Sequence, residues 1–202
     1  MIMKYAACIL LAATTPALAT APVVKDTSFR APDGSRVQQL ELVVDAPVAK
    51  VWDAFTTDAG FTSWAAPVAH VNLANDGIIE ATYSLSGKIG DPDNIRNQIV
   101  AFVPYKMIAF HNVHVPKGAP FKAEVISRIR TVVQLEDLGN GRTRIVESGV
   151  GYGEGADFDD MYAHFRSGNE EEFTALATYL TTGPVDWKAQ AAAAVASVND
   201  KK

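Results

Sequence analysis

The chain has almost no cysteine: Cys8 is the only one among its 202 residues, and it lies in an apolar stretch at the start of the sequence. Beyond that position there is no thiol for a disulfide, a thiolate nucleophile or a cysteine-ligated metal. Basic runs are also missing, and 18 Lys and Arg stand against 23 Asp and Glu, a formal net charge of −5. This acidic balance argues against nucleic acid and anionic membranes as partners.

Motifs for catalysis and metal binding are absent as well. Neither a G-x-S-x-G nucleophile elbow nor an H-E-x-x-H helix occurs. His111 and His114 are three positions apart, which places their rings on opposite faces of a strand rather than on one ion. The acidic loop 87–94 lacks the further oxygen ligands of a calcium loop and favours an Asx turn around Pro92. We therefore expect no metal and no cofactor.

A glycine-rich stretch, SGVGYGEG (148–155), directly precedes a helical pattern. Such loops can bind phosphate at a helix N-terminus. Here the glycines simply alternate, unlike the dinucleotide fingerprint, and Glu154, Asp157, Asp159 and Asp160 surround the helix start. These carboxylates favour the positive helix end themselves and repel phosphate. We interpret the stretch as a hinge between a strand and a helix.

The first nineteen residues, MIMKYAACILLAATTPALA, have the pattern of a bacterial signal peptide. Lys4 supplies a short basic start, an apolar run follows, and Ala17-Leu18-Ala19 is a small-x-small cleavage site. The apolar run is too short to span a bilayer, so we expect cleavage after Ala19 and no stable membrane insertion. The predicted location is the periplasm or the exterior.

The next part of the chain reads as strand, two short helices and a series of strands. An extended lead-in over 20–36 precedes a strand at 37–44 with alternating apolar residues. Asp45 caps a first helix, and a second short helix ends at Pro67. Turn residues such as Asn75-Asp76-Gly77 separate the later strands. These strands are predicted at 70–74, 78–85, 95–103, 106–113, 130–138 and 142–152.

The longest helical pattern runs from Asp157 to Leu180 and is followed by an Ala-rich tail over 181–202, which forms a surface helix or frays. The residues of its inward face are Phe158, Met161, Tyr162, Phe165, Phe173, Leu176 and Leu180. An antiparallel sheet needs one layer over its apolar face. We therefore predict an α+β fold in which a curved antiparallel sheet of about six to seven strands wraps around this helix, with a pocket between them.

This order of elements resembles the helix-grip fold of the START-like (SRPBCC) superfamily, in the branch named after the activator of a heat-shock chaperone ATPase. The resemblance covers 37–180, the predicted domain. The matching pieces are APVAKVWDAFTT (46–57), Trp64 just before a proline, TVVQLEDLGNGRTRIVESGVG (131–151) and FDDMYAHFRSG…FTALATYL (158–180). It implies a hydrophobic cavity for small apolar or amphipathic molecules and carries over no catalytic residues. Where relatives often have a Trp, this chain has Glu170-Glu171-Glu172, which we expect to be solvated.

Candidate ligand-binding residues come from the aromatic and helix-facing positions. Tyrosine and tryptophan suit a pocket wall because each combines an apolar ring with a polar tip. Strand alternation places His111 with Met107 and Ala109, and two readings follow: this face lines the cavity, or His111 is a hydrogen-bonded histidine at the sheet's edge. The predicted ligand-binding set is Trp64, Tyr83, His111, Phe158, Met161, Tyr162 and Phe165.

Glu147 and His111 are weak candidates for catalysis. Glu147 shares strand parity with Ile145, and a buried carboxylate with a raised pKa can act as a general base. The structural alternative, which we favour, is that a partner such as Arg144 or a neighbouring strand satisfies it outside the pocket.

Three functions follow from these patterns. The leading hypothesis is an exported domain that binds a small hydrophobic or amphipathic ligand without catalysis. The second is a cyclase, dehydratase or hydrolase acting in the same cavity, and the third is an envelope-interaction module that works through the Ala-rich tail. A co-chaperone role is disfavoured, because an exported chain would not meet a cytosolic ATPase. The sequence identifies neither the ligand nor the oligomeric state.

Overall fold

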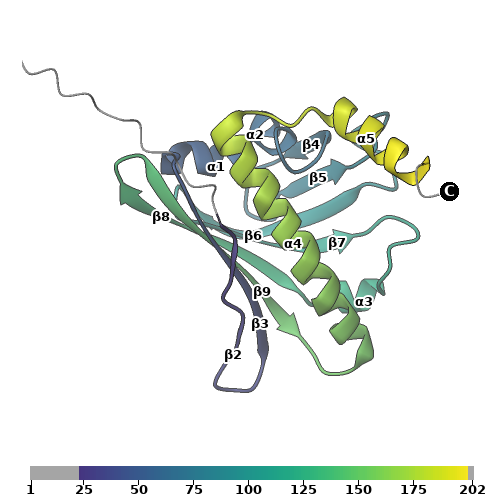
Figure 1. Cartoon of the computed structure of the whole chain (residues 1–202). Helices are drawn as coiled ribbons and strands as arrows, with labels where there is room; N and C mark the ends of the chain where they lie inside the picture. The colour runs from purple at the N-terminus through teal and green to yellow at the C-terminus, as the bar shows by residue number, and fades with distance from the viewer. Residues whose placement is uncertain (1–22, 200–202) are drawn as a thin grey trace, which may run out of the picture.

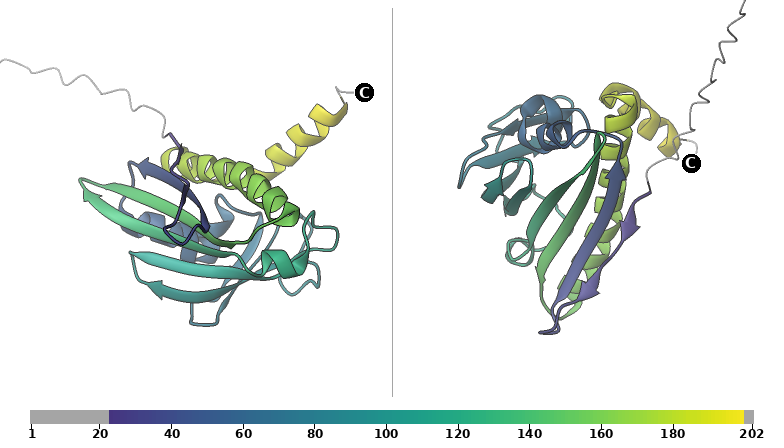
Figure 2. Two further views of the ribbon diagram at one scale, coloured as in Figure 1. Left: turned by 90° about the horizontal axis from the view of Figure 1, so that it is seen from below. Right: turned by 90° about the vertical axis from the view of Figure 1, so that its left-hand side faces the viewer.

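The computed structural model describes residues 23–199, so the predicted signal peptide lies outside the described residues. Figure 1 shows one curved sheet crossed diagonally by a single long helix, α4 (Ala156–Thr182). The left view of Figure 2 shows α4 lying over one side of this sheet. The α+β helix-grip prediction is confirmed.

The sheet is antiparallel, unclosed and built from seven principal strands. They follow one another in the order β3-β9-β8-β7-β6-β5-β4, so all neighbours except β3 and β9 are consecutive in the chain. Their bounds are β3 Arg36–Val44, β4 Val68–Val71, β5 Ile78–Thr82, β6 Ile95–Val103, β7 Met107–His114, β8 Arg130–Gly139 and β9 Arg142–Tyr152.

The lead-in contributes two further short strands that the sequence did not predict. Both β1 (Lys25–Asp26) and β2 (Phe29–Arg30) pair antiparallel with β3 at the edge of the sheet. Two residues per strand are too few to show an alternating pattern. The sheet therefore has nine strands rather than six or seven.

The main core lies between the inner face of the sheet, the first two helices and the C-terminal half of α4. Helices α1 (Val48–Thr56) and α2 (Asp58–Thr62) follow β3 as predicted. The inward residues of β3 and those of α4 are almost fully buried. They include Leu40, Leu42, Val44, Phe173, Leu176 and Leu180.

The N-terminal half of α4 covers a second, smaller apolar cluster. It packs Phe158 and Met161 against α3 (Ala123–Ile126), a single turn in the connection between the central strands β7 and β8. The tail forms α5 (Trp187–Asn199), which extends away from the sheet (Figure 2). Its start is held to α2 because the Trp187 indole donates a hydrogen bond to the carbonyl of Thr62 at 2.7 Å. No helix within residues 23–199 is long and apolar enough to cross a membrane.

Candidate functional site

A cavity of about 490 Å³ lies between the inner face of the sheet and the N-terminal half of α4. The connection between β7 and β8 forms one side of it. Helix α4 contributes His164, Phe165, Gly168, Asn169 and Glu172. The sheet contributes Ile95, Asn97, Phe110, Asn112, Thr131, Glu147, Gly149 and Tyr152, and the remaining residues are Tyr83, residues 115–121, Ile126 and Ile129.

One part of the lining is apolar and aromatic. Phe121 stacks on Phe165 with ring centroids 5.5 Å apart, and His164 meets the edge of Phe121 at 4.9 Å. Phe110 on β7 and Ile129 before β8 extend this surface across the floor of the cavity. Together they form a wall that can hold an apolar body.

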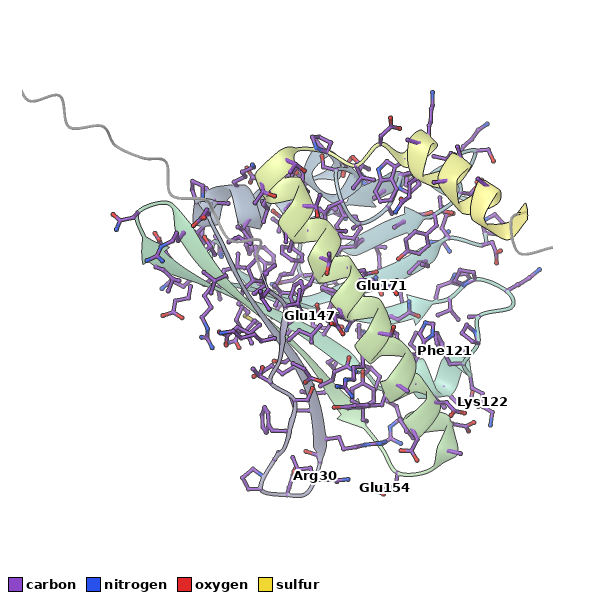
Figure 3. The ribbon with its side chains drawn as sticks, in the orientation of Figure 1. Arg30, Phe121, Lys122, Glu147, Glu154 and Glu171 are labelled. Carbon is purple, nitrogen blue, oxygen red and sulfur yellow. The ribbon has the colours of Figure 1, made fainter. Side chains whose placement is uncertain are left out.

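The opposite part of the lining is polar and centres on Glu147. Figure 3 labels Glu147 on β9, where the middle of α4 passes in front of the sheet. Its Oε1 accepts a hydrogen bond from the Asn169 side chain at 3.0 Å. Burial, with the nearby charge of Glu172, raises the pKa of Glu147 to about 8. Glu147 therefore faces the cavity, and the partner favoured from the sequence does not satisfy it, because Arg144 pairs with Glu41 and Glu136.

Glu172 is a second carboxyl group of the cavity. Its Oε1 accepts a hydrogen bond from the Tyr83 hydroxyl at 3.1 Å, which joins α4 to the segment after β5. Partial desolvation at the cavity raises the pKa of Glu172, although the Tyr83 hydrogen bond opposes that shift. All three consecutive glutamates are exposed, as expected, but Glu172 also lines the cavity, which Glu170 and Glu171 do not. The helical spacing of four residues to the buried Leu176 is the sequence signal that could have identified it.

Tyr152 reaches the same cavity because β9 contains an irregularity. Gln38 on β3 pairs with Gly149, yet Arg36 pairs with Tyr152, so β9 holds one extra residue at this point. Simple alternation would place Tyr152 on the face opposite Glu147. The extra residue, with Gly151 at a φ of +98°, turns Tyr152 inward instead. Burial, the charge of Glu147 and the nearby Tyr162 raise the pKa of the Tyr152 hydroxyl.

Gln38 links the polar groups to one another. Its side chain is 1 % exposed, and its Nε2 donates to the carbonyl of Tyr162 at 2.9 Å. Its Oε1 accepts hydrogen bonds from Asn169 at 3.2 Å and from the Tyr152 hydroxyl at 3.4 Å. A satisfied buried amide of this kind fixes the position of α4 over the sheet.

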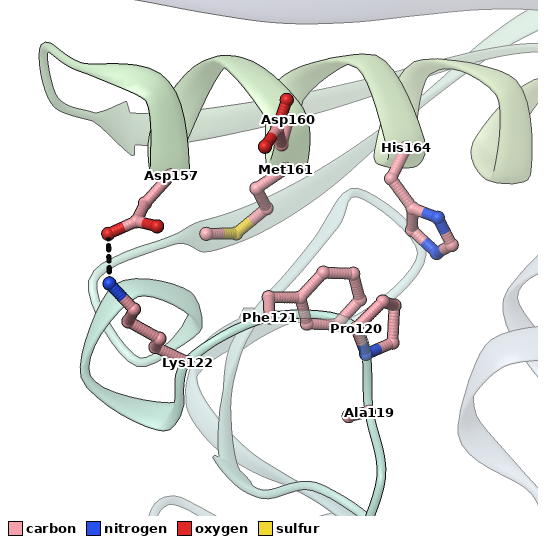
Figure 4. Close-up of a pocket in the computed structure, with 8 residues that line it drawn as sticks. All are labelled: Ala119, Pro120, Phe121, Lys122, Asp157, Asp160, Met161 and His164. Carbon is pink, nitrogen blue, oxygen red and sulfur yellow. Dashed lines mark hydrogen bonds and ion pairs between the residues drawn. The ribbon is translucent and has the colours of Figure 1, made fainter.

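A second pocket, of about 440 Å³, adjoins the cavity at the start of α4 (Figure 4). Phe121 and Pro120 face Met161 and His164 across it. An ion pair of 2.6 Å between Lys122 and Asp157 crosses one side. Asp157 is thus occupied by a side chain of the protein itself, as is Asp159, which pairs with Arg36. These pairs support reading the glycine-rich stretch as a hinge rather than as a phosphate site.

The structure brings only part of the predicted ligand-binding set to the cavity. Tyr83 and Phe165 line it, and Met161 lines the second pocket. Trp64, Phe158 and Tyr162 line neither, because their rings pack elsewhere. Trp64 is in the main core, where its indole donates to the Ala54 carbonyl at 2.9 Å. The guanidinium of Arg128 lies over Phe158, and Tyr162 meets the edge of Tyr152.

His111 lies on the opposite face of β7 from the cavity. Its neighbours Phe110 and Asn112 line the cavity, and His111 itself interacts through Nε2 with Gln98 Oε1 on the outer face at 3.2 Å. Burial, with the charge of Arg130, lowers its pKa. Adjacent residues of a strand point to opposite faces of the sheet, so His111 points away from the cavity that Phe110 and Asn112 line. The structure therefore does not bring His111 and Glu147 together.

The described residues offer no metal site. Within 23–199, no group of three His, Cys, Asp or Glu side chains comes close enough to hold an ion. In the acidic loop, the Asp91 carboxylate accepts from the backbone N–H of Lys88 at 2.8 Å, and Glu80 accepts from Gly90 and Asn94. These hydrogen bonds use the loop's carboxylates to hold its turn.

A curved antiparallel sheet with a long C-terminal helix across it, and a cavity between them, defines the START-like helix-grip class. Within this class the chain belongs to the family described as activator of Hsp90 ATPase homolog 1-like protein, whose model matches residues 45–181. No curated protein matches the sequence.

Solved structures of low sequence identity share this fold. The Aha1 dimer from Colwellia psychrerythraea has a TM-score of 0.57 and 18% identity, over 73% of this chain and 97% of that one. CalU16 from Micromonospora echinospora has a TM-score of 0.56 and 17% identity, over 83% and 88%. Protein MLL2253 from Mesorhizobium loti has a TM-score of 0.56 and 17% identity, over 74% and 100%. At such identities the likeness concerns the fold alone.

Proposed function

We propose that this protein is an exported domain that binds a small amphipathic molecule in the cavity between the sheet and α4. The observation that carries the proposal is the division of the cavity into an aromatic part and a polar part formed by Glu147, Glu172, Tyr83 and Tyr152. Ligand sites of proteins are mostly apolar concavities with a few convergent polar groups that fix orientation. The volume of about 490 Å³ falls within the usual range for small-molecule sites, roughly 300–1,000 Å³.

Gly168 supplies a direct way to test this proposal. It lies in the part of α4 that lines the cavity, and a Cβ added there would meet nothing within 4 Å. A leucine at this position keeps the helix, because leucine is a good helix former, and fills space that a ligand would occupy. We expect Gly168→Leu to weaken binding of the neutral lipophilic probe N-phenyl-1-naphthylamine at least about tenfold, the loss of about 1.4 kcal/mol. Probe fluorescence titration measures this change.

Gly168→Ala is the matched control. It should leave probe affinity within about twofold and stabilise the fold by about 0.5–1 kcal/mol, since glycine is unfavourable inside a helix. Equal probe affinity in the wild type and in the folded Leu variant would contradict binding in this cavity.

Catalysis in the cavity is the second candidate function, favoured by one observation. Glu147 has a pKa raised to about 8 and faces the same space as the Tyr152 hydroxyl. A carboxyl group that changes protonation near neutral pH can act as a general acid or base. Catalysis by Glu147 and Tyr152 would not involve His111. The wild type should then convert a bound molecule, and Glu147→Gln should not. Mass spectrometry of the ligand after incubation with each protein measures this.

Export is proposed on the sequence of residues 1–19, and it bears on the family name. The family is named after an activator of a chaperone ATPase, but an exported chain would not meet a cytosolic ATPase. Fractionation of cells expressing the full chain, followed by N-terminal sequencing, tests this part of the proposal. We expect a mature N-terminus at Thr20, and an uncleaved cytosolic protein would contradict it.

A further inference from the structure

We propose that the molecule bound in this cavity is an organic amine, with one positive charge held by Glu147 and Glu172 and an apolar body held by the aromatic part of the lining. The inference rests on the proposed function, since it assigns the charge of the ligand that the cavity takes. Four features of the cavity support it: the carboxyl group that lies deepest among its charged residues, the carboxyl oxygens without a donor, the aromatic rings of the lining, and the repulsion between the two carboxyl groups.

The charged groups of the lining favour a cation. Glu147 on β9 and Glu172 on α4 belong to the same cavity, close enough for the charge of Glu172 to act on Glu147. Of the charged residues in the lining, Glu147 is half-buried, whereas Glu172, Lys117 and His164 are exposed. The guanidinium of Arg36 is the basic group near Tyr152, and it is paired with Asp159. The charged group that lies deepest in the cavity is therefore a carboxyl group.

Each of the two carboxyl groups keeps one oxygen available to a ligand. Glu147 accepts at Oε1 from Asn169, and Glu172 accepts at Oε1 from Tyr83. Among the residues that the structure describes, no group donates a hydrogen bond to either Oε2. An ammonium group has three donors and no acceptor, which matches carboxyl oxygens that lack a donor.

Aromatic rings line the cavity together with the carboxyl groups. Tyr83 follows β5 and donates to Glu172, Tyr152 ends β9, and Phe165 lies one helical turn before Asn169 on α4. The face of an aromatic ring attracts a cation, most strongly where water is excluded. The same rings give the apolar body of an amine a surface to pack on.

The carboxyl pair suits a positive charge. Two carboxyl groups that share a partly desolvated site repel each other, and a cation between them removes that repulsion. Because the pKa of Glu147 is raised to about 8, part of this group is protonated at pH 7.5, and a bound cation, which lowers that pKa, releases the proton. An anion would add to the repulsion.

Three probes test the inference. They share a naphthylmethyl body and differ in the group attached to it, which is a cation in 1-naphthylmethylamine, neutral in 1-naphthylmethanol and an anion in 1-naphthaleneacetate. Isothermal titration at pH 7.5 gives their affinities. We expect the amine to bind at least about tenfold more tightly than the alcohol, and the acetate most weakly. Repeating the amine titration in two buffers of different ionisation enthalpy should show release of a proton.

The variant Glu147→Gln/Glu172→Gln should remove the advantage of the amine, so that its affinity falls to about that of the alcohol. Glu172→Gln alone serves the same purpose if the double variant does not fold. Glu171→Gln, which changes an exposed neighbour, is the control and should alter no affinity.

The outcomes separate this inference from the proposed function. Equal affinities for amine and alcohol, or a preference for the acetate, would overturn the amine assignment while the cavity remains a binding site. If no naphthalene probe and no N-phenyl-1-naphthylamine binds, the proposed function fails together with the inference.

Discussion

Gly151→Ala is expected to destabilise the fold by about 4 kcal/mol, a large part of the stability of an ordinary domain. Two effects add at this position. Gly151 has a φ of +98°, which costs a residue with a side chain of order 1–3 kcal/mol. A Cβ would also clash with the carbonyl oxygen of Arg128, and forced overpacking adds about 1–3 kcal/mol. Urea unfolding, followed by circular dichroism, measures the loss.

Gly155→Ala is the matched control for that substitution. Gly155 has a φ of +104°, but a Cβ there would meet nothing within 4 Å. It should therefore lose only the backbone term, about 2 kcal/mol. Equal losses in the two variants would contradict the role given to the Arg128 contact. Because Gly151 also turns Tyr152 into the cavity, any folded Gly151→Ala protein should bind the neutral probe more weakly than Gly155→Ala does.

Glu147→Gln is expected to flatten the dependence of stability on pH between about 4.5 and 8. In the unfolded chain Glu147 titrates near 4.5, whereas burial raises its pKa to about 8 in the folded protein. Between these values the folded state binds a proton that the unfolded state has lost, so stability falls as pH rises through this window. Below about pH 4.5 the neutral carboxyl group carries no penalty, and above pH 8 the whole penalty is present.

The expected size of this effect is about 2 kcal/mol at pH 9, where the Gln variant should be the more stable protein. If no water reached Glu147, the shift of its pKa from 4.5 to about 8 would correspond to a stability difference of about 5 kcal/mol. Water can enter the cavity and screens the charge, so we expect a smaller difference. At pH 4.5 the two proteins should be equally stable.

Groups that titrate in both proteins cancel when the free energy of unfolding of the variant is subtracted from that of the wild type at each pH. The control Glu171→Gln should show the same pH dependence of stability as the wild type. Among the groups facing Glu147, the pKa of Glu172 shifts in the same direction, while raised pKa values keep Tyr83 and Tyr152 neutral over this range. Parallel curves for wild type and Glu147→Gln would show that the carboxyl group is not desolvated.

The sequence identified the elements of the fold because their signals are local. Apolar residues alternate along β3 and recur at helical spacing along α4, and both patterns can be read from the sequence. The turns contain residues that tolerate a positive φ, such as Asp76 and Asn140, whose φ values are 60° and 53°. The lead-in strands β1 and β2 were missed because their pairing depends on the neighbouring β3 and not on their own sequence. Alternation also correctly placed Glu147 on the same face as Ile145.

Which inward residues line the cavity was decided only by the tertiary structure. Helical and strand periodicity tell inside from outside, but they do not tell a packed core from an open space. Trp64 and Phe158 point inward and are covered by other groups, whereas Tyr83 and Phe165 point inward and border the cavity. Tyr152 depends on one extra residue in β9, which shifts every later side chain to the other face. The sequence thus determined the sheet and the helix across it, and three-dimensional packing determined that two carboxyl groups share the space between them.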